Sequence, residues 1–233
     1  RHLWHKKSFE GTPEIKDQNL RNHRANWSRQ SAPTKNKLIH LISNYYGMIS
    51  LIDHNVGRIQ NMIHELGLDK STLTIFTSDH GEWLGDHGLL LKGPMLYEGL
   101  LRVGLILKAP WLKKGVRNNQ PVSTLDIAPT IYDYARLDYP YLLHGQSLRP
   151  QIERNENRDF SFSEWDLRPS RNGTKLKLKT VKTHNTKLTF DMLSETGEMY
   201  NLRDDPDEMD NLFDAKGYAQ LKNQLMDMIK SRP

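Results

Sequence analysis

The chain has 233 residues, of which 36% are apolar, enough for one sizeable core or for a core with a small appended subdomain. Its longest apolar runs are far too short to span a bilayer, and neither a signal peptide nor a nucleic-acid-binding motif is visible, so we expect neither a membrane span nor a nucleic-acid partner. The sequence contains no cysteine, which excludes disulfides, thiolate metal sites and a cysteine nucleophile within these residues.

The net charge of +5 is unevenly distributed along the chain. Residues 1–37 carry nine Lys or Arg against three Asp or Glu, and their apolar residues follow neither a helical nor a strand period. A basic arm can bind nucleic acid or an anionic substrate, but a solvated irregular segment has the same composition. Because no aromatic residues interleave the basic ones in a stripe, we interpret residues 1–37 as an irregular basic segment.

A long amphipathic helix is predicted to begin near Lys37. Apolar residues recur at three- and four-residue spacing as far as Leu66, and Gly67 stands where a helix C-cap glycine belongs. The run STLTIF, residues 71–76, has the continuous apolar, β-branched character of a buried strand of the parallel type. Helix, short turn, buried strand and polar loop are typical of an open sheet with helices on its faces, in which ligands bind beyond the carboxyl ends of the strands.

Two further elements belong to this α/β region. RVGLILKAP, residues 102–110, is predicted to form a second strand. VSTLDIAPTIYDYARL, residues 122–137, is predicted to contain a strand end followed by a helix, with Thr124 or Asp126 as the N-cap and Pro129 in the first turn.

The pattern changes after residue 150, so we predict an α/β core at 38–150 and a smaller subdomain at 151–233. Residues 151–158 have the composition of a charged linker. Short, partly alternating segments separated by turn residues then indicate an antiparallel sheet, and a last amphipathic helix is predicted near 215–230. The strand segments are 160–165, 175–182, 187–190 and 197–202.

The stretch TSDHGEWLGDHGLLLKG, residues 77–93, follows the first predicted strand at the end where such sheets bind ligands. Asp79 and His80 could both bind a divalent cation, since oxygen donors suit Ca²⁺ or Mg²⁺ and an added nitrogen donor widens the choice towards Mn²⁺ or Zn²⁺. Adjacent strand residues point to opposite faces, so both can reach one ion only where the strand breaks, and Gly81 supplies that break. Two ligands are too few for a site, so others must come from elsewhere.

Lys92 follows His80 by 12 residues and would suit a substrate that is an anionic ester. A lysine near a metal neutralises charge on such a substrate and can give a proton to a leaving oxygen. Each residue also has an ordinary structural interpretation: a loop with a turn glycine for SDHG, a surface lysine for Lys92 and a loop histidine for His87. The residues alone leave both interpretations open.

Four segments, in order, resemble the type I sulfatases of the alkaline phosphatase-like superfamily. The resemblance covers roughly residues 38–212. It implies an α/β fold that comprises the C-terminal half of the mixed, mostly parallel sheet of a sulfatase core, followed by a small C-terminal antiparallel sheet with a final helix. The segments are YYGMISLIDHNVGRI (45–59), TIFTSDHGEWLGDHGLLLKGPMLYEGLLRVGLILKAP (74–110), VSTLDIAPTIYDYARL with HGQSLRP (122–137 and 144–150) and EMYNLRDDPDEMDNL (198–212).

The resemblance also implies roles for residues that match the family's motifs. Asp79 and His80 match the late pair of metal ligands, with Ca²⁺ as the implied ion and Mg²⁺ or Mn²⁺ as alternatives. Lys92 matches the active-site lysine that contacts the sulfate, and His87 in the same loop either takes part in catalysis or has a structural role. His184 falls in a segment that can approach the site in relatives, which makes it a candidate substrate-binding residue. The implied activity is that of a sulfuric ester hydrolase acting on a sulfated small molecule or carbohydrate, in a periplasmic or secreted protein.

The family's nucleophile is absent from these residues. It is a formylglycine made from the Cys or Ser of a C/S-x-P-x-R motif near the start of the fold, where an acidic pair supplies the other metal ligands. SAPTK, residues 31–35, ends in Lys, and LRPSR, residues 167–171, begins with Leu and follows the SDHG region, so neither is that motif. Because the chain begins with Arg1 and not with Met, we expect the nucleophile to lie upstream, in the missing N-terminal half of the same protein, and these residues alone to be inactive.

Two other functions are compatible with the sequence. A phosphonate or phosphate ester hydrolase of the same superfamily would share SDHG, although the spacing to Lys92 and the segment DDPDEMDNL favour a sulfatase. A non-catalytic chain that keeps the fold and binds sulfated glycans would explain the missing nucleophile and the basic arm.

Overall fold

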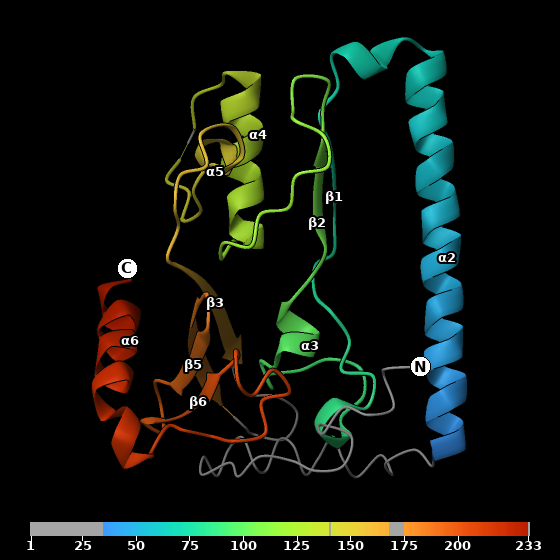
Figure 1. Cartoon of the computed structure of the whole chain (residues 1–233). Helices are drawn as coiled ribbons and strands as arrows, with labels where there is room; N and C mark the ends of the chain where they lie inside the picture. Colours follow the sequence, from blue (N-terminus) through green and yellow to red (C-terminus); the bar gives the residue numbers. More distant parts are fainter. Residues whose placement is uncertain (1–34, 140, 168–174, 233) are drawn as a thin grey trace.

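The computed structural model describes residues 35–139, 141–167 and 175–232, so most of the basic segment 1–37 lies outside the described residues. Helix α2, Lys35–Glu65, confirms the predicted long helix, and Gly67, just after its end, has the left-handed φ of 68° expected of a C-cap glycine. The helix runs along one side of the molecule (Figure 1), and only Ile42 on it is buried. Among the described helices, none is both long and apolar enough to cross a membrane.

Strands β1, Thr74–Thr77, and β2, Leu105–Lys108, form a two-stranded sheet in which Ile75 lies opposite Leu107. The strands are antiparallel, so the prediction of a parallel type of strand at 71–76 was wrong. A continuous apolar run indicates which strands lose contact with water, but it carries no information about the direction of the neighbouring strand. Phe76 and Ile106 are largely exposed, and the described part of the chain adds no third strand to this sheet.

After β1 the chain forms a long loop that contains the short 3-10 turn η4, Asp86–Gly88, and then the single-turn helix α3, Glu98–Leu101. The loop is not a surface excursion, because it supplies most of a hydrophobic core that it shares with the C-terminal sheet. Trp83, Leu89 and Met95 from the loop pack in one cluster with Leu178 and Tyr200 from that sheet. The two predicted subdomains therefore share a core.

A second group of helices lies at the other end of the molecule (Figure 1) and comprises η5, Thr124–Asp126, α4, Ile127–Ala135, and α5, Arg149–Glu153. Asp126, one of the two predicted candidates, is the N-cap of α4, although its side chain makes no capping hydrogen bond to that helix. The preceding turn η5 is capped by Ser123, whose side chain forms a reciprocal capping box with that of Asp126. The predicted strand end before this helix is absent, and α5 occupies the start of the predicted charged linker.

The C-terminal subdomain is an antiparallel meander, as predicted. Its strands are β3, Phe160–Leu167, β4, Leu176–Thr183, β5, Thr186–Asp191, and β6, Thr196–Asn201, in that order across the sheet. The turn η6, Lys216–Tyr218, leads into the last helix, α6, Ala219–Ser231, which packs on one face of the sheet (Figure 1). The core beneath α6 consists of Val181, Leu188, Met199, Leu225 and Ile229.

Candidate active site

Asp79 and His80 lie in a tight turn directly after the carboxyl end of β1. The hydroxyl of Ser78 donates to the carbonyl of His80 at 2.8 Å, and the Asp79 carboxylate accepts the backbone N–H of His80 at 2.9 Å. The next residue, Gly81, donates its N–H to the carbonyl of Leu100 at 2.7 Å, and a Cβ at this position would lie 2.1 Å from the carbonyl oxygen of Gly99. Only glycine fits this approach, so the sequence prediction of a chain break at Gly81 has a steric cause.

The ring of His80 is held in one tautomer. Its Nδ1 lies 2.8 Å from the carbonyl oxygen of Gly81, and a carbonyl can only accept, so Nδ1 carries the proton. The other ring nitrogen, Nε2, lies 3.5 Å from Oδ2 of Asp79. Hydrogen bonding to the His80 N–H lowers the pKa of Asp79; burial opposes this, and the charge of His80 and the Ser78 hydroxyl lower the pKa further. The pair thus presents a carboxylate oxygen and an imidazole nitrogen side by side.

This donor set fits part of a divalent-metal site. A backbone carbonyl that orients the ring of a histidine through its second nitrogen is a common arrangement behind metal ligands. Among the residues that the structure describes, no group of three or more His, Cys, Asp or Glu side chains could hold a metal ion. The described residues therefore bring two candidate ligands together and do not form a complete site.

Lys92 is exposed at the end of a loop that closes on itself. The N–H of Trp83 donates to the carbonyl of Leu91 at 3.2 Å, and the N–H of Gly85 donates to Leu89 at 2.8 Å. Three residues other than glycine in this loop have a left-handed backbone, Leu84 (φ 51°), His87 (φ 55°) and Leu91 (φ 66°). Such strained conformations persist only where the surroundings hold them, and they often occur at functional sites.

Glu82 is the residue that holds this loop, and sequence reasoning gave it no role. Its Oε1 accepts the N–H of Leu84 at 3.3 Å and, through a very short hydrogen bond, the N–H of Leu91. Burial raises the pKa of Glu82, and the two N–H groups and the charges of His80 and Lys92 oppose that rise. A lone carboxylate in a polar loop is usually taken as solvent-exposed, so the sequence gives little sign that Glu82 binds the backbone next to Lys92. The only available signal was that both residues lie in the same loop.

His87 and His184 lie in different surroundings from the Asp79–His80 pair. His87 is 2% exposed and stacks on the ring of Tyr97 with 3.8 Å between the ring centroids. His184 is exposed in the turn between β4 and β5, where it borders a hollow of about 410 Å³ together with Gln120 and Asn157. Within the described ranges, no hydrogen bond or ion pair joins His184 to Asp79, His80 or Lys92. The structure thus groups the Asp79–His80 pair with the loop of Lys92, and it gives His87 a buried position.

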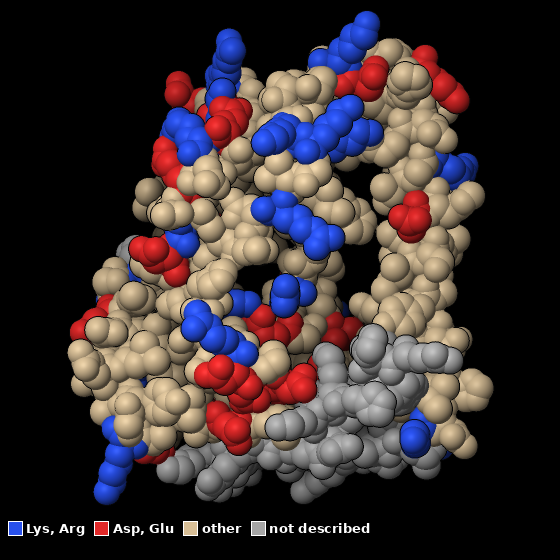
Figure 2. Space-filling view, in the orientation of Figure 1, with Lys and Arg blue, Asp and Glu red and all other residues tan. Residues whose placement is uncertain are grey.

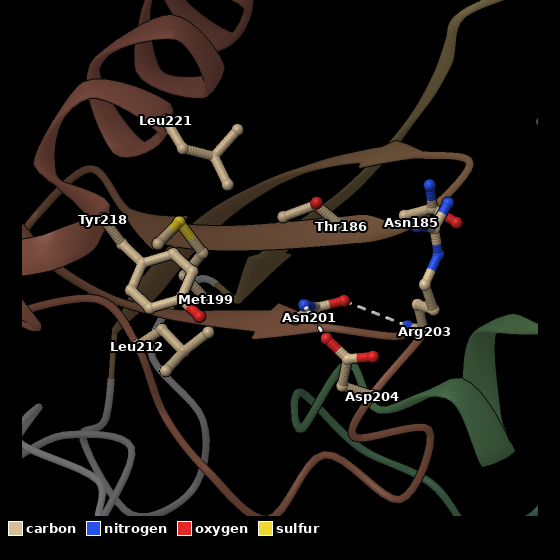
Figure 3. Close-up of a pocket in the computed structure, with 9 residues that line it drawn as sticks. All are labelled: Asn185, Thr186, Met199, Asn201, Arg203, Asp204, Leu212, Tyr218 and Leu221. Carbon is tan, nitrogen blue, oxygen red and sulfur yellow. Dashed lines mark hydrogen bonds between the residues drawn. The ribbon is translucent and has the colours of Figure 1, made fainter.

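A second hollow, of about 150 Å³, lies between the sheet and the start of α6 (Figure 3). Its polar side is organised by Asn201, which accepts the N–H of Arg203 at 3.1 Å and donates to Asp204 at 2.7 Å. None of the predicted site residues borders it, so it is separate from the candidate site. The lining residues are Asn185, Thr186, Met199, Asn201, Arg203, Asp204, Leu212, Tyr218 and Leu221.

Two family models match this chain. The model described as N-sulphoglucosamine sulphohydrolase, C-terminal, matches residues 85–232, and the model described as sulfatase matches residues 2–137. The chain belongs to the sulfatase family. The predicted recognition is therefore confirmed, and the candidate site lies within the matched residues.

Curated sulfatases are similar to most of this chain. An N-acetylglucosamine-6-O-sulfatase of Bacteroides thetaiotaomicron is 30% identical over 193 residues, which are 80% of this chain and 34% of that protein. An arylsulfatase of Clostridium perfringens is 33% identical over 184 residues, 76% of this chain and 36% of that protein. The chain thus spans about a third of the length of these curated relatives.

Solved structures confirm the predicted sulfatase fold of the alkaline phosphatase-like class. A protein in complex with its substrate D-glucosamine-2-N,6-O-disulfate superposes with a TM-score of 0.71 and 26% identity, over 90% of this chain and 44% of that one. The phosphonate monoester hydrolase of Agrobacterium radiobacter superposes with a TM-score of 0.74 and 29% identity, over 84% of this chain and 41% of that one.

Proposed function

We propose that the whole protein that contains this chain is a sulfuric ester hydrolase, in which Asp79, His80 and Lys92 form one side of the active site. The observation that carries the proposal is the fixed geometry of the first two residues: the Asp79 carboxylate lies beside Nε2 of His80, while Nδ1 of the same ring bonds the carbonyl of Gly81. Membership of the sulfatase family supports the assignment of this pair to a metal site.

Asp79 and His80 would hold a divalent cation, with Ca²⁺ preferred and Mg²⁺ or Mn²⁺ as alternatives. When bound, the ion would supply Lewis-acid polarisation of the sulfate oxygens. Asp79 would contribute the negative charge, and because the carbonyl of Gly81 bonds Nδ1 of His80, Nε2 is the ring nitrogen that would serve as the ligand.

Lys92 would bind the anionic ester and reduce the cost of the negative charge that develops on the leaving oxygen. An ammonium group on an exposed side chain can reach a ligand at the loop surface and can give up a proton there. The bonds that Glu82 and Trp83 make to Leu91 hold the backbone just before Lys92, so the lysine projects from a defined point. His87, buried against Tyr97, would support this loop from the core side. His184 would contact the substrate if the β4–β5 turn borders the completed site.

The nucleophile, a formylglycine, and the remaining metal ligands would lie on a part of the protein that precedes Arg1. The chain spans about a third of its curated relatives, which supports this assignment. The exposed apolar side chains of α2, including Met48, Leu51 and Ile52, and the exposed Phe76 and Ile106 offer a surface for such a part to cover. In this proposal residues 38–150 belong to the α/β core and residues 151–233 form the C-terminal subdomain.

The substrate would be a sulfated carbohydrate or a sulfated small molecule. A relative named as an N-acetylglucosamine-6-O-sulfatase and a neighbour bound to D-glucosamine-2-N,6-O-disulfate support the carbohydrate. A periplasmic or secreted location would suit such a substrate. The alternative of a chain that only binds sulfated glycans has less support on the face shown in Figure 2, because that face carries acidic as well as basic side chains.

A phosphonate or phosphate ester hydrolase is the second candidate, since two phosphonate monoester hydrolases superpose with TM-scores of 0.74 and 0.76. The deciding experiment compares the kcat/KM of the whole protein for an aryl sulfate, an aryl phosphonate monoester and an aryl phosphodiester. A preference for the aryl sulfate supports the sulfatase. A preference for either phosphorus ester supports the second candidate, and binding of sulfated glycans without any turnover supports the binding protein.

A further inference from the structure

A buried ion pair connects the C-terminal sheet to the segment that follows the Lys92 loop. Lys187 on β5 and Glu208, in the turn after β6, are in direct contact, and their side chains are only 1% and 2% exposed. Lys187 also donates to the carbonyl of Leu96 at 2.6 Å, and Glu208 accepts the backbone N–H of Glu98 at 2.6 Å. The pair therefore binds the backbone on both sides of Tyr97.

Two side-chain contacts strengthen the same connection. Lys182 on β4 forms an ion pair with the carboxylate of Glu98, and the hydroxyl of Tyr97 donates to Glu198 on β6 at 3.5 Å. Nζ of Lys187 also lies 5.9 Å from the centroid of the Tyr97 ring, within range of a cation–π interaction. Three strands of the C-terminal sheet thus hold one short segment, Leu96–Glu98.

Tyr97 connects the segment Leu96–Glu98 to the loop of the candidate site. Its ring stacks on His87, and His87 lies in the middle of the loop that Glu82 closes before Lys92. The rings are 3.8 Å apart and inclined by 23°, so a shift of Tyr97 would displace His87 or open a gap in the core. The same loop has the left-handed residues that need their surroundings to hold them.

Stability alone does not account for this pair. Removing two charges from water is costly, and apolar side chains of similar volume often give an equally stable or more stable core. A buried pair with well-directed hydrogen bonds instead specifies one geometry, because the alternatives leave a charge without a partner.

We propose that Lys187 and Glu208 are positioning residues for the sulfatase reaction. By holding Leu96–Glu98 against the C-terminal sheet, they fix Tyr97 and His87 and hence the loop that presents Lys92. This inference rests on the proposed function, since the loop is catalytic only if the whole protein hydrolyses an ester. It gives the C-terminal subdomain a part in catalysis beyond completing the fold.

The test uses the whole protein and two variants, Glu208→Gln and the double variant Lys187→Met with Glu208→Gln. The first keeps an acceptor for the N–H of Glu98, and the second leaves no unpaired charge in the core. Thr180→Val is the matched control, because it removes a buried hydrogen bond of 2.9 Å to Thr189 in the same sheet without touching Leu96–Glu98. The measurements are kcat and KM for an aryl sulfate, the melting temperature, and hydrogen–deuterium exchange of the peptide that covers residues 82–92.

The double variant should lower kcat about 10- to 100-fold at a temperature well below its melting point, as expected when a reacting group is misplaced. Faster exchange in residues 82–92 should accompany this loss, and Glu208→Gln should show a smaller change in the same direction. The control should lose stability but keep its kcat and its loop exchange. Unchanged loop exchange in both folded variants, or an equal fall of kcat in Thr180→Val, would overturn the proposal. If the wild-type protein hydrolyses no ester, the proposed function fails, while the exchange data still decide whether the ion pair holds the loop.

Discussion

The carboxylate of Glu82 accepts the backbone N–H of Leu91, the residue immediately before Lys92. Together with the bond from the Trp83 N–H to the carbonyl of Leu91, this bond closes the loop that follows the Asp79–His80 turn. In our proposal it lets residues on both sides of the loop face one ligand. Glu82 is also close enough to His80 and Lys92 for their charges to act on its pKa.

Replacing Glu82 should impair catalysis through the position of Lys92. Glu82→Ala removes the acceptor of two N–H groups, so kcat for a sulfate ester should fall about 10- to 100-fold. Glu82→Gln keeps an acceptor oxygen and should recover most of that loss. Steady-state kinetics of both variants in the whole protein provide the check, and equal kcat values for Glu82→Gln and Glu82→Ala would contradict a positioning role based on the hydrogen bonds.

Asp79 and His80 should determine metal content. Asp79→Asn and His80→Ala should each weaken the affinity for Ca²⁺ at least about 10-fold. Loss of a group that only hydrogen-bonds to a metal ligand already costs about this much, and loss of the ligand itself should cost no less. Metal analysis after dialysis against a chelator gives the measurement, without recourse to activity. Asp69→Asn is a suitable control, because Asp69 is an exposed partner of His64 away from the turn. Full metal retention in both site variants would rule out this pair as ligands.

Gly81 should tolerate no side chain. A Cβ would lie 2.1 Å from the carbonyl of Gly99, so Gly81→Ala must displace backbone and should cost about 1–3 kcal/mol of unfolding free energy. Gly57→Ala is the control, because Gly57 lies within α2 with nothing within 4 Å of its added Cβ, and alanine favours helix there. Urea unfolding of the two variants decides the matter: equal stabilities would show that the turn can move aside.

Asp133 should make the stability of the α4–α5 connection depend on pH. The hydroxyl of Ser147 at 2.6 Å, followed by Arg149 at 3.0 Å, lowers the pKa of Asp133 below its ordinary value of 3.8. Because the folded-state pKa is the lower one, this stabilisation is complete above the ordinary value and is lost as the pH falls through the folded-state value.

The gap in melting temperature between wild type and Asp133→Asn should therefore be largest near about pH 6 and close towards about pH 3. The effect should be about 1 kcal/mol or less, since the Asp133 side chain is 31% exposed. A gap that widens on acidification would show that the carboxylate destabilises the fold.

The sequence predicted the helices and strands with strong periodicity better than it predicted how those elements pair and where they are capped. The long helix that ends at Gly67, the four-stranded meander and the last helix follow from local patterns of 3.6 and 2.0 residues, and all three are present. The antiparallel pairing of β1 with β2 differs from the parallel type predicted for residues 71–76, because strand orientation depends on how the connecting loop packs, which periodicity does not encode. Asp126 was correctly offered as the N-cap of α4, but the cap of Ser123 on the preceding turn η5 was not predicted, since three neighbouring residues there can all accept a hydrogen bond.

The candidate site was partly predictable. Asp79, His80 and Lys92 carry chemistry that is recognisable in one loop, and a family motif assigns them roles. Glu82, Lys187 and Glu208 do not stand out, because their importance comes from backbone groups that they bind 9, 91 and 110 residues away in the chain, counting from Leu91, Leu96 and Glu98. Long-range hydrogen bonds of this kind leave no periodic signal in a single sequence.

Release of sulfate from an aryl sulfate by the whole protein, measured for the wild type and for Lys92→Ala, tests the central claim most directly. Lys92 is exposed, so its replacement should leave the melting temperature unchanged. The account predicts turnover by the wild type, loss of that turnover on chelation of the metal, and a kcat/KM about 100- to 1,000-fold lower in Lys92→Ala. Equal kcat/KM values for the two proteins would contradict the assignment of this loop to the active site.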